Sequence, residues 1–255
     1  MARIARVVIP GIPHHITQRG NRRMQTFFSE DDYQEYIALM TDACCRYEVD
    51  VWAYCLMPNH VHIIAVPLET RSFRHAIGEA HRRYTRRINF REKWRGHLWQ
   101  ERFASYPMSE HHLLAASRYV ELNPVRAGLA KEPWSYKWSS AAPHIERCGN
   151  GFVRVEPLLE LMPDWRSFLE EDITKEEMER FRFHERTGRP LGDETFTQRL
   201  EQMTCRLLRR RKTGPKKRGN VFLIYLSFFV SLTHPKPSSH QSVRPTPSKL
   251  TRGLD

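Results

Sequence analysis

The order of hydrophobic and polar positions changes period along the first part of the chain. Residues 14–19 have the character of a β-strand, and Gly20-Asn21 after them is a dipeptide typical of a turn. Polar residues suited to capping follow at 29–32, and apolar positions then repeat at helical spacing to about Tyr47. The pattern therefore predicts a strand, a turn and a helix.

Two apolar, β-rich runs at 51–56 and 60–66 are separated by a turn-like break at 57–59, which predicts a hairpin. The spacing of apolar positions then predicts a second helix over 71–89 and a further strand within 99–108. These elements extend the sheet and supply it with a second covering helix.

A last helix of this region opens at Ser109 and ends or kinks near Asn123, because Pro124 disfavours helical geometry in the residue before it. The elements then follow the order β-α-β-β-α-β-α. This order predicts an α+β fold, a ferredoxin-like antiparallel sheet with helices on one face.

The character of the sequence changes after about residue 150. Helical, charge-rich segments at 164–182 and 193–208 lead into basic clusters that end at Arg218. An apolar run over 221–232 and a stretch rich in proline and serine come next, with a composition typical of a disordered tail. We therefore expect a catalytic domain at 1–150, a helical basic accessory region at 151–218 and an atypical tail at 219–255.

The charge of the chain favours a polyanionic partner. The formal net charge is +12, and 40% hydrophobic residues exclude a wholly disordered chain. Two segments, 74–95 and 206–218, together carry +14, so the rest of the chain is close to neutral. We therefore expect a folded protein with a basic surface that binds a polyanion, and no small-molecule substrate.

Cysteine usage and the N-terminal residues suggest a cytoplasmic protein. The five cysteines are odd in number and lack a paired CxxC spacing, and the first 15 residues have no long apolar stretch of the kind found in signal peptides. The apolar run at 221–232 is about half as long as a membrane span requires. We expect no membrane association.

Two histidines flank Val61 within an apolar strand. Strand alternation places His60 and His62 on one face, so both imidazoles can ligate one divalent ion. The alternative is that they are polar residues on a solvent face, or core histidines with hydrogen-bond partners.

Tyr119 and Asn123 lie four residues apart, hence on one face of a helix with Cβ atoms about 5–6 Å apart. A phenol that acts as a nucleophile and a neutral oxygen ligand could then approach the same ion. In the alternative interpretation, Tyr119 packs against the sheet and Asn123 simply ends the helix.

The segment 81–87 (HRRYTRR) is a basic helix in which few acidic residues stand at positions suited to pairing. Such a stripe would neutralise phosphates, and its alternative is an ordinary solvated face. The aromatic residues Trp94, Trp99 and Tyr106 could stack on unpaired bases or lie in the core.

Several motifs occur together in a fixed order: 18–22 (QRGNR), 56–62 (LMPNHVH), 96–100 (GHLWQ) and 119–128 (YVELNPVRAG). With them, the chain closely resembles the REP-associated tyrosine transposases, relatives of the single-strand transposases in the HUH superfamily of nucleases. The similarity covers about residues 1–145. Residues 187–192 (TGRPLG) resemble the accessory C-terminal region of that family.

The resemblance implies an HUH nuclease fold and an enzyme that cuts and rejoins single-stranded DNA. By it, His60, His62 and Asn123 ligate Mg²⁺ or Mn²⁺, and Tyr119 is the nucleophile that forms a 5′-phosphotyrosine. The implied substrates are hairpin-forming REP elements, the implied location is the cytoplasm at the nucleoid, and the protein would act as a monomer or homodimer.

Basic residues near these motifs and in the accessory region are the candidates for binding DNA. They are Arg19, Arg22, Arg82, Arg83, Arg86, Arg87, Arg126, Arg209, Arg210, Arg211, Lys216 and Lys217. Two other functions stay open at this point. One is a domesticated protein that binds REP hairpins or structured RNA without cutting them, and the other is a metal-dependent phosphodiesterase that uses water.

Overall fold

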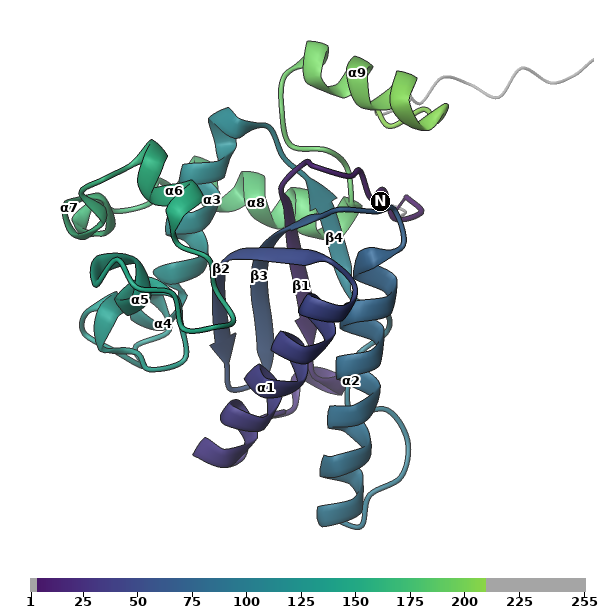
Figure 1. The fold of residues 1–255 in the computed structure, drawn as a ribbon, viewed down its shortest axis with the longest axis vertical. Coiled ribbons are helices and arrows are strands. Elements are labelled where there is room, and N and C mark those ends of the chain that lie inside the picture. Colours follow the sequence, from purple (N-terminus) through teal and green to yellow (C-terminus); the bar gives the residue numbers. More distant parts are fainter. Residues whose placement is uncertain (1–3, 210–255) are drawn as a thin grey trace, which may run out of the picture. The chain divides into compact units, whose positions relative to one another are not determined.

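A computed structural model describes residues 4–209 of the chain, which form one compact unit, and residues 1–3 and 210–255 lie outside the description. Figure 1 shows the arrangement of the helices and strands. In chain order they are β1 (His14–Arg19), a 3-10 turn η1 (Asn21–Arg23), α1 (Glu30–Arg46), β2 (Val49–Met57), β3 (His60–Pro67), α2 (Ser72–Arg91), β4 (Ala104–Pro107), α3 (Glu110–Glu121), α4 (Asn123–Arg126), a 3-10 turn η2 (Pro133–Ser135), α5 (Ala141–Ile145), α6 (Glu156–Leu161), α7 (Trp165–Glu170), α8 (Lys175–Thr187) and α9 (Glu194–Thr204).

The four strands form one antiparallel sheet in the order β2-β3-β1-β4. Together with the chain order β1-α1-β2-β3-α2-β4, this is the ferredoxin-like topology that the sequence predicts. The register between β1 and β3 sets Thr17 opposite His62 and Arg19 opposite His60. The pairing fixes which side chains share a face, because alternate residues of a strand point to opposite sides.

Helices cover both faces of the sheet, whereas the sequence predicts helices on one face. The His14 ring contacts Phe73 of α2 at 5.1 Å, and the ring of the next residue, His15, lies 6.0 Å from Tyr119 of α3. Helices α1 and α2 lie side by side on the first face, as expected, and α3 and α8 cover the second (Figure 1). The expectation was wrong for α3 because a helix that follows the last strand is free to cross to the uncovered face.

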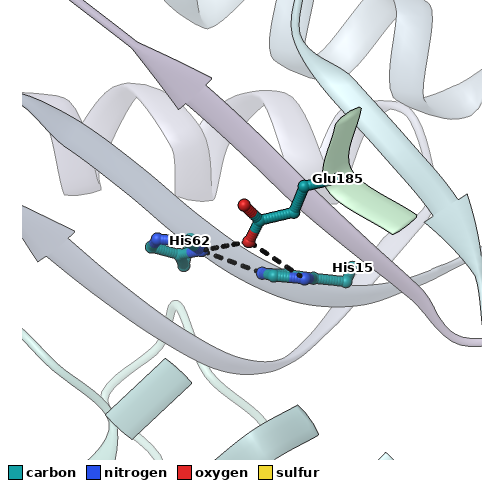
Figure 2. Close-up of side chains that lie close together, drawn as sticks. All are labelled: His15, His62 and Glu185. Atoms are coloured by element: carbon teal, nitrogen blue, oxygen red, sulfur yellow. Dashed lines mark hydrogen bonds and ion pairs between the residues drawn. The ribbon is translucent and has the colours of Figure 1, made fainter. Parts of the chain in front are cut away.

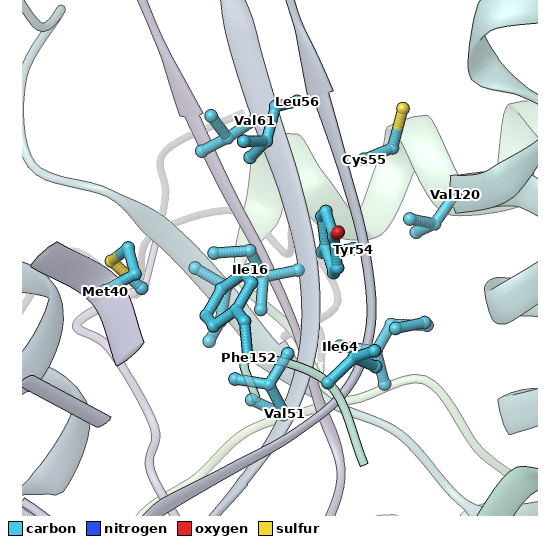
Figure 3. Packing of buried hydrophobic residues seen from close by; sticks show 14 of the residues in the cluster. Ile16, Met40, Val51, Tyr54, Cys55, Leu56, Val61, Ile64, Val120 and Phe152 are labelled. Carbon is cyan, nitrogen blue, oxygen red and sulfur yellow. The ribbon is translucent and has the colours of Figure 1, made fainter. Parts of the chain in front are cut away.

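The main core lies between the sheet and the helices on either side of it. Ile16 and Val61 are almost fully buried on the face of α1 and α2, and Val120 of α3 is buried on the opposite side (Figure 3). Tyr54 and Phe152 extend the same cluster towards the C-terminal half of the chain. Residues beyond 150 therefore share a core with the sheet.

Two elements differ from their predicted lengths. The strand expected within 99–108 is only four residues long, because Glu101 adopts a φ of 58° and Trp99 makes only an isolated bridge to Gly20. The helical segment expected at 164–182 is divided into α7 and α8. Its second helix starts anew at a capping box in which the Thr174 hydroxyl accepts from the Glu177 backbone N–H at 3.2 Å.

Several expectations fall outside the described residues. These are the basic clusters from residue 210 onward, the apolar run at 221–232 and the disordered tail at 219–255. Among residues 4–209, no helix combines the length and apolar character needed to cross a membrane.

A fully buried carboxylate ties α3 to the helices that follow it. Glu121 accepts hydrogen bonds from the Trp165 indole at 2.7 Å, from His144 at 2.8 Å and from the Ser140 hydroxyl. A buried charge is tolerated where such donors surround it. Glu121 stands between Tyr119 and Asn123 in the sequence, so this network holds the end of α3 in place.

We expect Glu121→Ala to lower the free energy of unfolding by about 3 kcal/mol, because it leaves three buried donors without an acceptor. Urea unfolding of the variant and the wild type measures the difference. Glu146→Ala, at an exposed carboxylate directly after α5, should change stability by less than about 0.5 kcal/mol. A loss below 1 kcal/mol for Glu121→Ala would contradict this structural role.

Candidate functional site

The second face of the sheet borders a cleft of about 1010 Å³. Its walls come from β1, β3, the segment before β4, α3 and α8. The cleft brings together the four residues that the sequence singles out for chemistry, namely His60, His62, Tyr119 and Asn123. It also contains Arg19 from β1 and Glu185 from α8.

The two strand histidines point to the same face, as alternation predicts, and their ring centroids lie 5.0 Å apart. Burial lowers the pKa of His60 to about 4, and the charge of Arg19 acts in the same direction. Burial also holds the pKa of His62 well below its usual range. Both imidazoles are therefore neutral at pH 7, which is the form that ligates metal ions.

Tyr119 is buried at the edge of the cleft, with its ring 5.8 Å from that of His62 and 4.9 Å from that of Phe181. Burial and the neighbouring Glu185 raise the pKa of Tyr119 to about 12, and Arg126 opposes this shift. The Arg126 guanidinium lies 4.5 Å from the Tyr119 ring centre and donates to the Tyr119 carbonyl at 2.9 Å. The phenol is thus held neutral beside a cation.

Asn123 begins α4, directly after the break that Pro124 predicts. Its amide nitrogen donates to the Tyr119 carbonyl at 3.3 Å. This bond fixes which end of the amide is the donor, so the side-chain oxygen is the group that Asn123 can offer to a ligand in the cleft.

Behind His62 runs a chain of buried hydrogen bonds, of which Figure 2 shows the link between His62 and His15. The Nδ1 atom of His62 lies 2.9 Å from Nε2 of His15, and Nδ1 of His15 lies 2.8 Å from the Tyr106 hydroxyl. If the His62 Nδ1–H donates to His15, then His15 donates in turn to Tyr106, and Nε2 of His62 keeps its lone pair. Such outer partners fix the tautomer of a metal-binding histidine.

Glu185 reaches the same place from α8, with Oε1 at 3.7 Å from His62 Nδ1 and 3.9 Å from His15 Nδ1 (Figure 2). Burial raises the pKa of Glu185 to about 7, against the charges of Arg19 and Arg182. Ligand atoms of His15, His62 and Glu185 all lie within 4.8 Å of one another, so these three residues form another group able to hold a metal ion. The hydrogen bond between His15 Nε2 and His62 Nδ1, however, occupies two of the nitrogens that this group would need to bind an ion.

The residues of the cleft fit a divalent ion at His60, His62 and Asn123. Nδ1 of His60 lies 2.6 Å from Asn59 Oδ1, and Nδ1 of His62 is engaged by His15. In each ring the second nitrogen is then the one that can ligate. Two neutral imidazoles and an amide oxygen leave the charge of an ion free to act on a phosphate.

Of the basic residues predicted to bind DNA, four are exposed and have no ion pair with another described residue: Arg19, Arg22, Arg82 and Arg86. Arg19 lies in the cleft, and Arg22, in η1, adopts a φ of 53°. Arg126 is directed onto Tyr119. Arg210, Arg211, Lys216 and Lys217 lie outside the described residues.

The expectation that the basic helix has few acidic partners is wrong for two of its arginines. Arg83 lies 2.8 Å from Asp42, and Arg87 lies 3.6 Å from Glu35. Both carboxylates belong to α1, which packs beside α2 and brings acids that local spacing does not reveal. Arg209 is likewise paired, at 2.7 Å from Glu201.

The three aromatic residues considered as stacking platforms have different environments. Trp94 is 40% exposed, whereas Trp99 and Tyr106 are buried in the core. Trp99 stacks on His81 with ring centroids 4.6 Å apart, and Tyr106 bonds to His15. Only Trp94 of the three is accessible to a base.

His15, Tyr106 and Glu185 are the site residues that sequence reasoning missed as such. His15 was visible only as part of a strand, and its approach to His62 depends on the register between β1 and β3. Glu185 comes from a helix about 120 residues away in the sequence from the two histidines. No local pattern marks a residue that arrives by packing alone.

Residues 9–123 match the family described as "Transposase IS200 like". The matched segment starts just before β1 and ends at Asn123, so it includes all four strands and the four chemical residues of the cleft. Residues 9–123 are therefore similar to an IS200-like transposase domain. The segments after Asn123, including α8 with Glu185, lie beyond this match.

Two solved structures resemble the transposase domain and its surroundings. One is described as the REP-associated tyrosine transposase bound to a REP hairpin, with 20% sequence identity and a TM-score of 0.50 over 60% of this chain and 89% of that chain. The other is a Deinococcus radiodurans R1 protein described as a candidate transposase, with 21% identity and a TM-score of 0.33 over 47% and 96%. The first comparison supports the α+β fold described above. No curated protein matches the chain.

Proposed function

We propose that the protein is a tyrosine transposase that cleaves and rejoins single-stranded DNA, with Tyr119 as the nucleophile. The observation that carries the proposal is the convergence of His60, His62, Tyr119 and Asn123 on one cleft of a transposase domain. A pure binding protein has no chemical need for this combination. The DNA hairpin held by the solved relative supports a hairpin-forming REP element as the substrate.

In the proposed reaction, the Tyr119 oxygen attacks the scissile phosphorus and loses its proton. The bond from phosphorus to the 3′ oxygen breaks, leaving a 5′-phosphotyrosine and a 3′-OH that has gained a proton. Bound Mg²⁺ or Mn²⁺ would polarise the phosphate. The bond energy is kept in the phosphotyrosine, so a second 3′-OH can rejoin the strand without a nucleotide cofactor.

The side chains around Tyr119 suit this role. The Arg126 guanidinium beside the ring favours negative charge on the oxygen, and it counteracts the effect of burial on the Tyr119 pKa. The exposed Arg19 lines the cleft, and the exposed Arg22 follows it in η1; both would bind phosphates next to the scissile bond. The remaining predicted residues (Arg82, Arg83, Arg86, Arg87, Arg209, Arg210, Arg211, Lys216 and Lys217) would bind the hairpin, and a protein that acts on chromosomal DNA would work in the cytoplasm, at the nucleoid.

The test uses a labelled DNA hairpin with single-stranded flanks, incubated with the protein and Mn²⁺, and looks for an adduct that survives SDS. The wild type should form it. Cleavage without an adduct would favour a phosphodiesterase that uses water. Binding with neither cleavage nor adduct, over a panel of hairpins, would favour a domesticated protein that binds hairpins or structured RNA.

The hydrogen bonds from His62 to His15 and from His15 to Tyr106 give a separate prediction. His15→Phe should weaken Mn²⁺ binding about 10–100-fold, because His62 loses the partner that fixes its tautomer and ring orientation. Isothermal titration with Mn²⁺, in a background of Tyr119→Phe to exclude turnover, measures this affinity.

His14→Phe is the matched control for this measurement. His14 is also fully buried, but its ring faces α2 on the other side of the sheet. This substitution should leave Mn²⁺ affinity unchanged at a similar cost in stability. Equal effects of the two substitutions would show that His15 acts only through the stability of the fold.

A further inference from the structure

The end of α2 and the loops beside it carry aromatic side chains that the core leaves in solvent. Phe90 is 88% exposed, Trp94 40% and Phe28 38%. Within residues 4–209, every exposed phenylalanine, tryptophan or tyrosine is one of these three. The rings of Phe28 and Trp94 are in contact, and Phe90 precedes Trp94 by four residues at the end of α2. Large aromatic residues this exposed are uncommon in a folded protein and point to a binding surface. We call Phe28, Phe90 and Trp94 the aromatic patch.

The patch is held in place by the surrounding fold. The rings of Phe28 and Trp94 meet edge to face, with centroids 5.6 Å apart. The Trp94 backbone N–H donates to the Asn89 carbonyl at 2.9 Å, which turns the chain back at the end of α2. Arg91 lies 5.7 Å from the Phe28 ring centre and pairs with the buried Asp32. The aromatic faces are therefore presented by an ordered segment, which lowers the entropy cost of binding.

Basic residues flank the patch in the sequence. Arg22, Arg23, Lys93 and Arg95 are exposed, and none of them has an ion pair with another residue in the described part of the chain. Arg22, Arg23 and Lys93 also adopt φ angles of 53°, 61° and 54°. Residues other than glycine rarely adopt a positive φ, and such backbone strain is frequent at ligand-binding sites. Aromatic faces with a cationic rim are complementary to unpaired nucleotides.

A short series of contacts joins the patch to the cleft. Asn59, whose Oδ1 lies 2.6 Å from His60 Nδ1, donates through Nδ2 to the Arg23 carbonyl at 3.2 Å. The backbone N–H of Asn21 donates to the Leu98 carbonyl at 2.8 Å, which attaches the loop after α2 to η1. A strand that leaves the cleft past Arg22 and Arg23 would thus run towards the segments that carry the patch.

We propose that the aromatic patch is a stacking platform for unpaired bases of single-stranded DNA next to the cleavage site. The inference rests on the proposed function and adds a specific binding surface to it. Unpaired bases expose the π faces that aromatic side chains stack on, whereas a duplex hides them inside its stack. The patch therefore recognises the single-stranded part of the substrate, and the hairpin stem is held elsewhere.

The test compares the wild type with Phe90→Ala, Trp94→Ala and the double variant by fluorescence anisotropy, in EDTA so that no cleavage occurs. One labelled oligonucleotide is a hairpin with single-stranded flanks, and the other is the same hairpin with blunt ends. Each substitution should weaken binding of the flanked hairpin about tenfold, and the pair about 100-fold. Binding of the blunt hairpin should change by less than about twofold.

Leu68→Ala is the matched control, since Leu68 is 62% exposed but follows β3 at the end opposite His60. It should bind both oligonucleotides like the wild type. Trp94→Tyr should restore most of the affinity and Trp94→Leu should not, because stacking requires an aromatic face. The dependence of affinity on salt should stay the same in the aromatic variants, because they remove no phosphate contact.

Unchanged affinity for the flanked hairpin, equal losses for both oligonucleotides, or full rescue by Trp94→Leu would overturn the stacking platform. So would loss of binding to anionic lipid vesicles in the double variant with DNA affinity intact, which would make the patch a membrane surface. If the wild type binds and cleaves DNA and the aromatic variants do so equally well, only the stacking platform is refuted. A wild type that binds neither oligonucleotide refutes the proposed function together with it.

Discussion

Tyr119→Phe is expected to abolish the covalent adduct and to lower DNA cleavage by at least about 10³-fold, because it removes only the attacking oxygen. The phenylalanine ring can keep the contacts with Phe181 and with the Arg126 guanidinium, so the fold and the cleft should be preserved. The measurement is the yield of SDS-resistant protein–DNA adduct with Mn²⁺, together with the rate at which a labelled strand is cut.

Tyr47→Phe is the control for this experiment. Tyr47 bonds to Glu79 beside the helices on the other face of the sheet, and loss of its hydroxyl should leave adduct formation unchanged. The Tyr119→Phe protein should still bind the hairpin within about threefold of wild-type affinity. If it still forms the adduct, another residue is the nucleophile and the assignment of Tyr119 is wrong.

The second large effect is expected for the histidines. His60→Ala should reduce cleavage on the order of 10³-fold, which corresponds to the several kcal/mol that a bound divalent ion contributes to charge stabilisation. His62→Ala should have a similar effect. Both variants should also lose Mn²⁺ binding in a titration that involves no turnover, because each removes a neutral imidazole from the cleft.

DNA binding separates this prediction from a general loss of structure. In EDTA, His60→Ala should bind the flanked hairpin as the wild type does, since the basic residues and the aromatic patch are unchanged. His111→Ala, at an exposed histidine in the first turn of α3, should retain both cleavage and Mn²⁺ affinity. Normal Mn²⁺ affinity in both His60→Ala and His62→Ala would place the ion away from these histidines. Normal affinity in His60→Ala with loss in His62→Ala would instead favour the group of His15, His62 and Glu185.

Much of the fold follows from local sequence rules. The strand predicted at 14–19 is β1, because Gly20-Asn21 ends it, and the break at 57–59 separates β2 from β3. Pro124 ends α3 and leaves Asn123 at the start of α4. The local rules fail where one residue takes an unusual conformation, as Glu101 does before the short β4.

In the candidate site, too, local sequence rules predict some features and fail for others. Alternation along β3 and helical spacing on α3 indicate His60, His62, Tyr119 and Asn123 as pairs, and the ordered motifs add the expected family. Charge was harder to interpret from sequence, because the surplus over 74–95 is partly neutralised by carboxylates of α1. For Trp99 the sequence left open whether the ring stacks on bases or lies in the core, and the structure places it in the core.

The sequence by itself determined the elements, the positions of the chemical residues on them and the transposase motifs, because these depend on residues close together in the chain. Only the tertiary structure decided that the histidine pair and the tyrosine helix share a cleft, that His15 and Tyr106 stand behind His62, and that Glu185 enters from α8. The physical reason is that strand register and the face chosen by each helix are set by burial of the whole core. Contacts across long sequence separations follow from that burial and leave no local pattern.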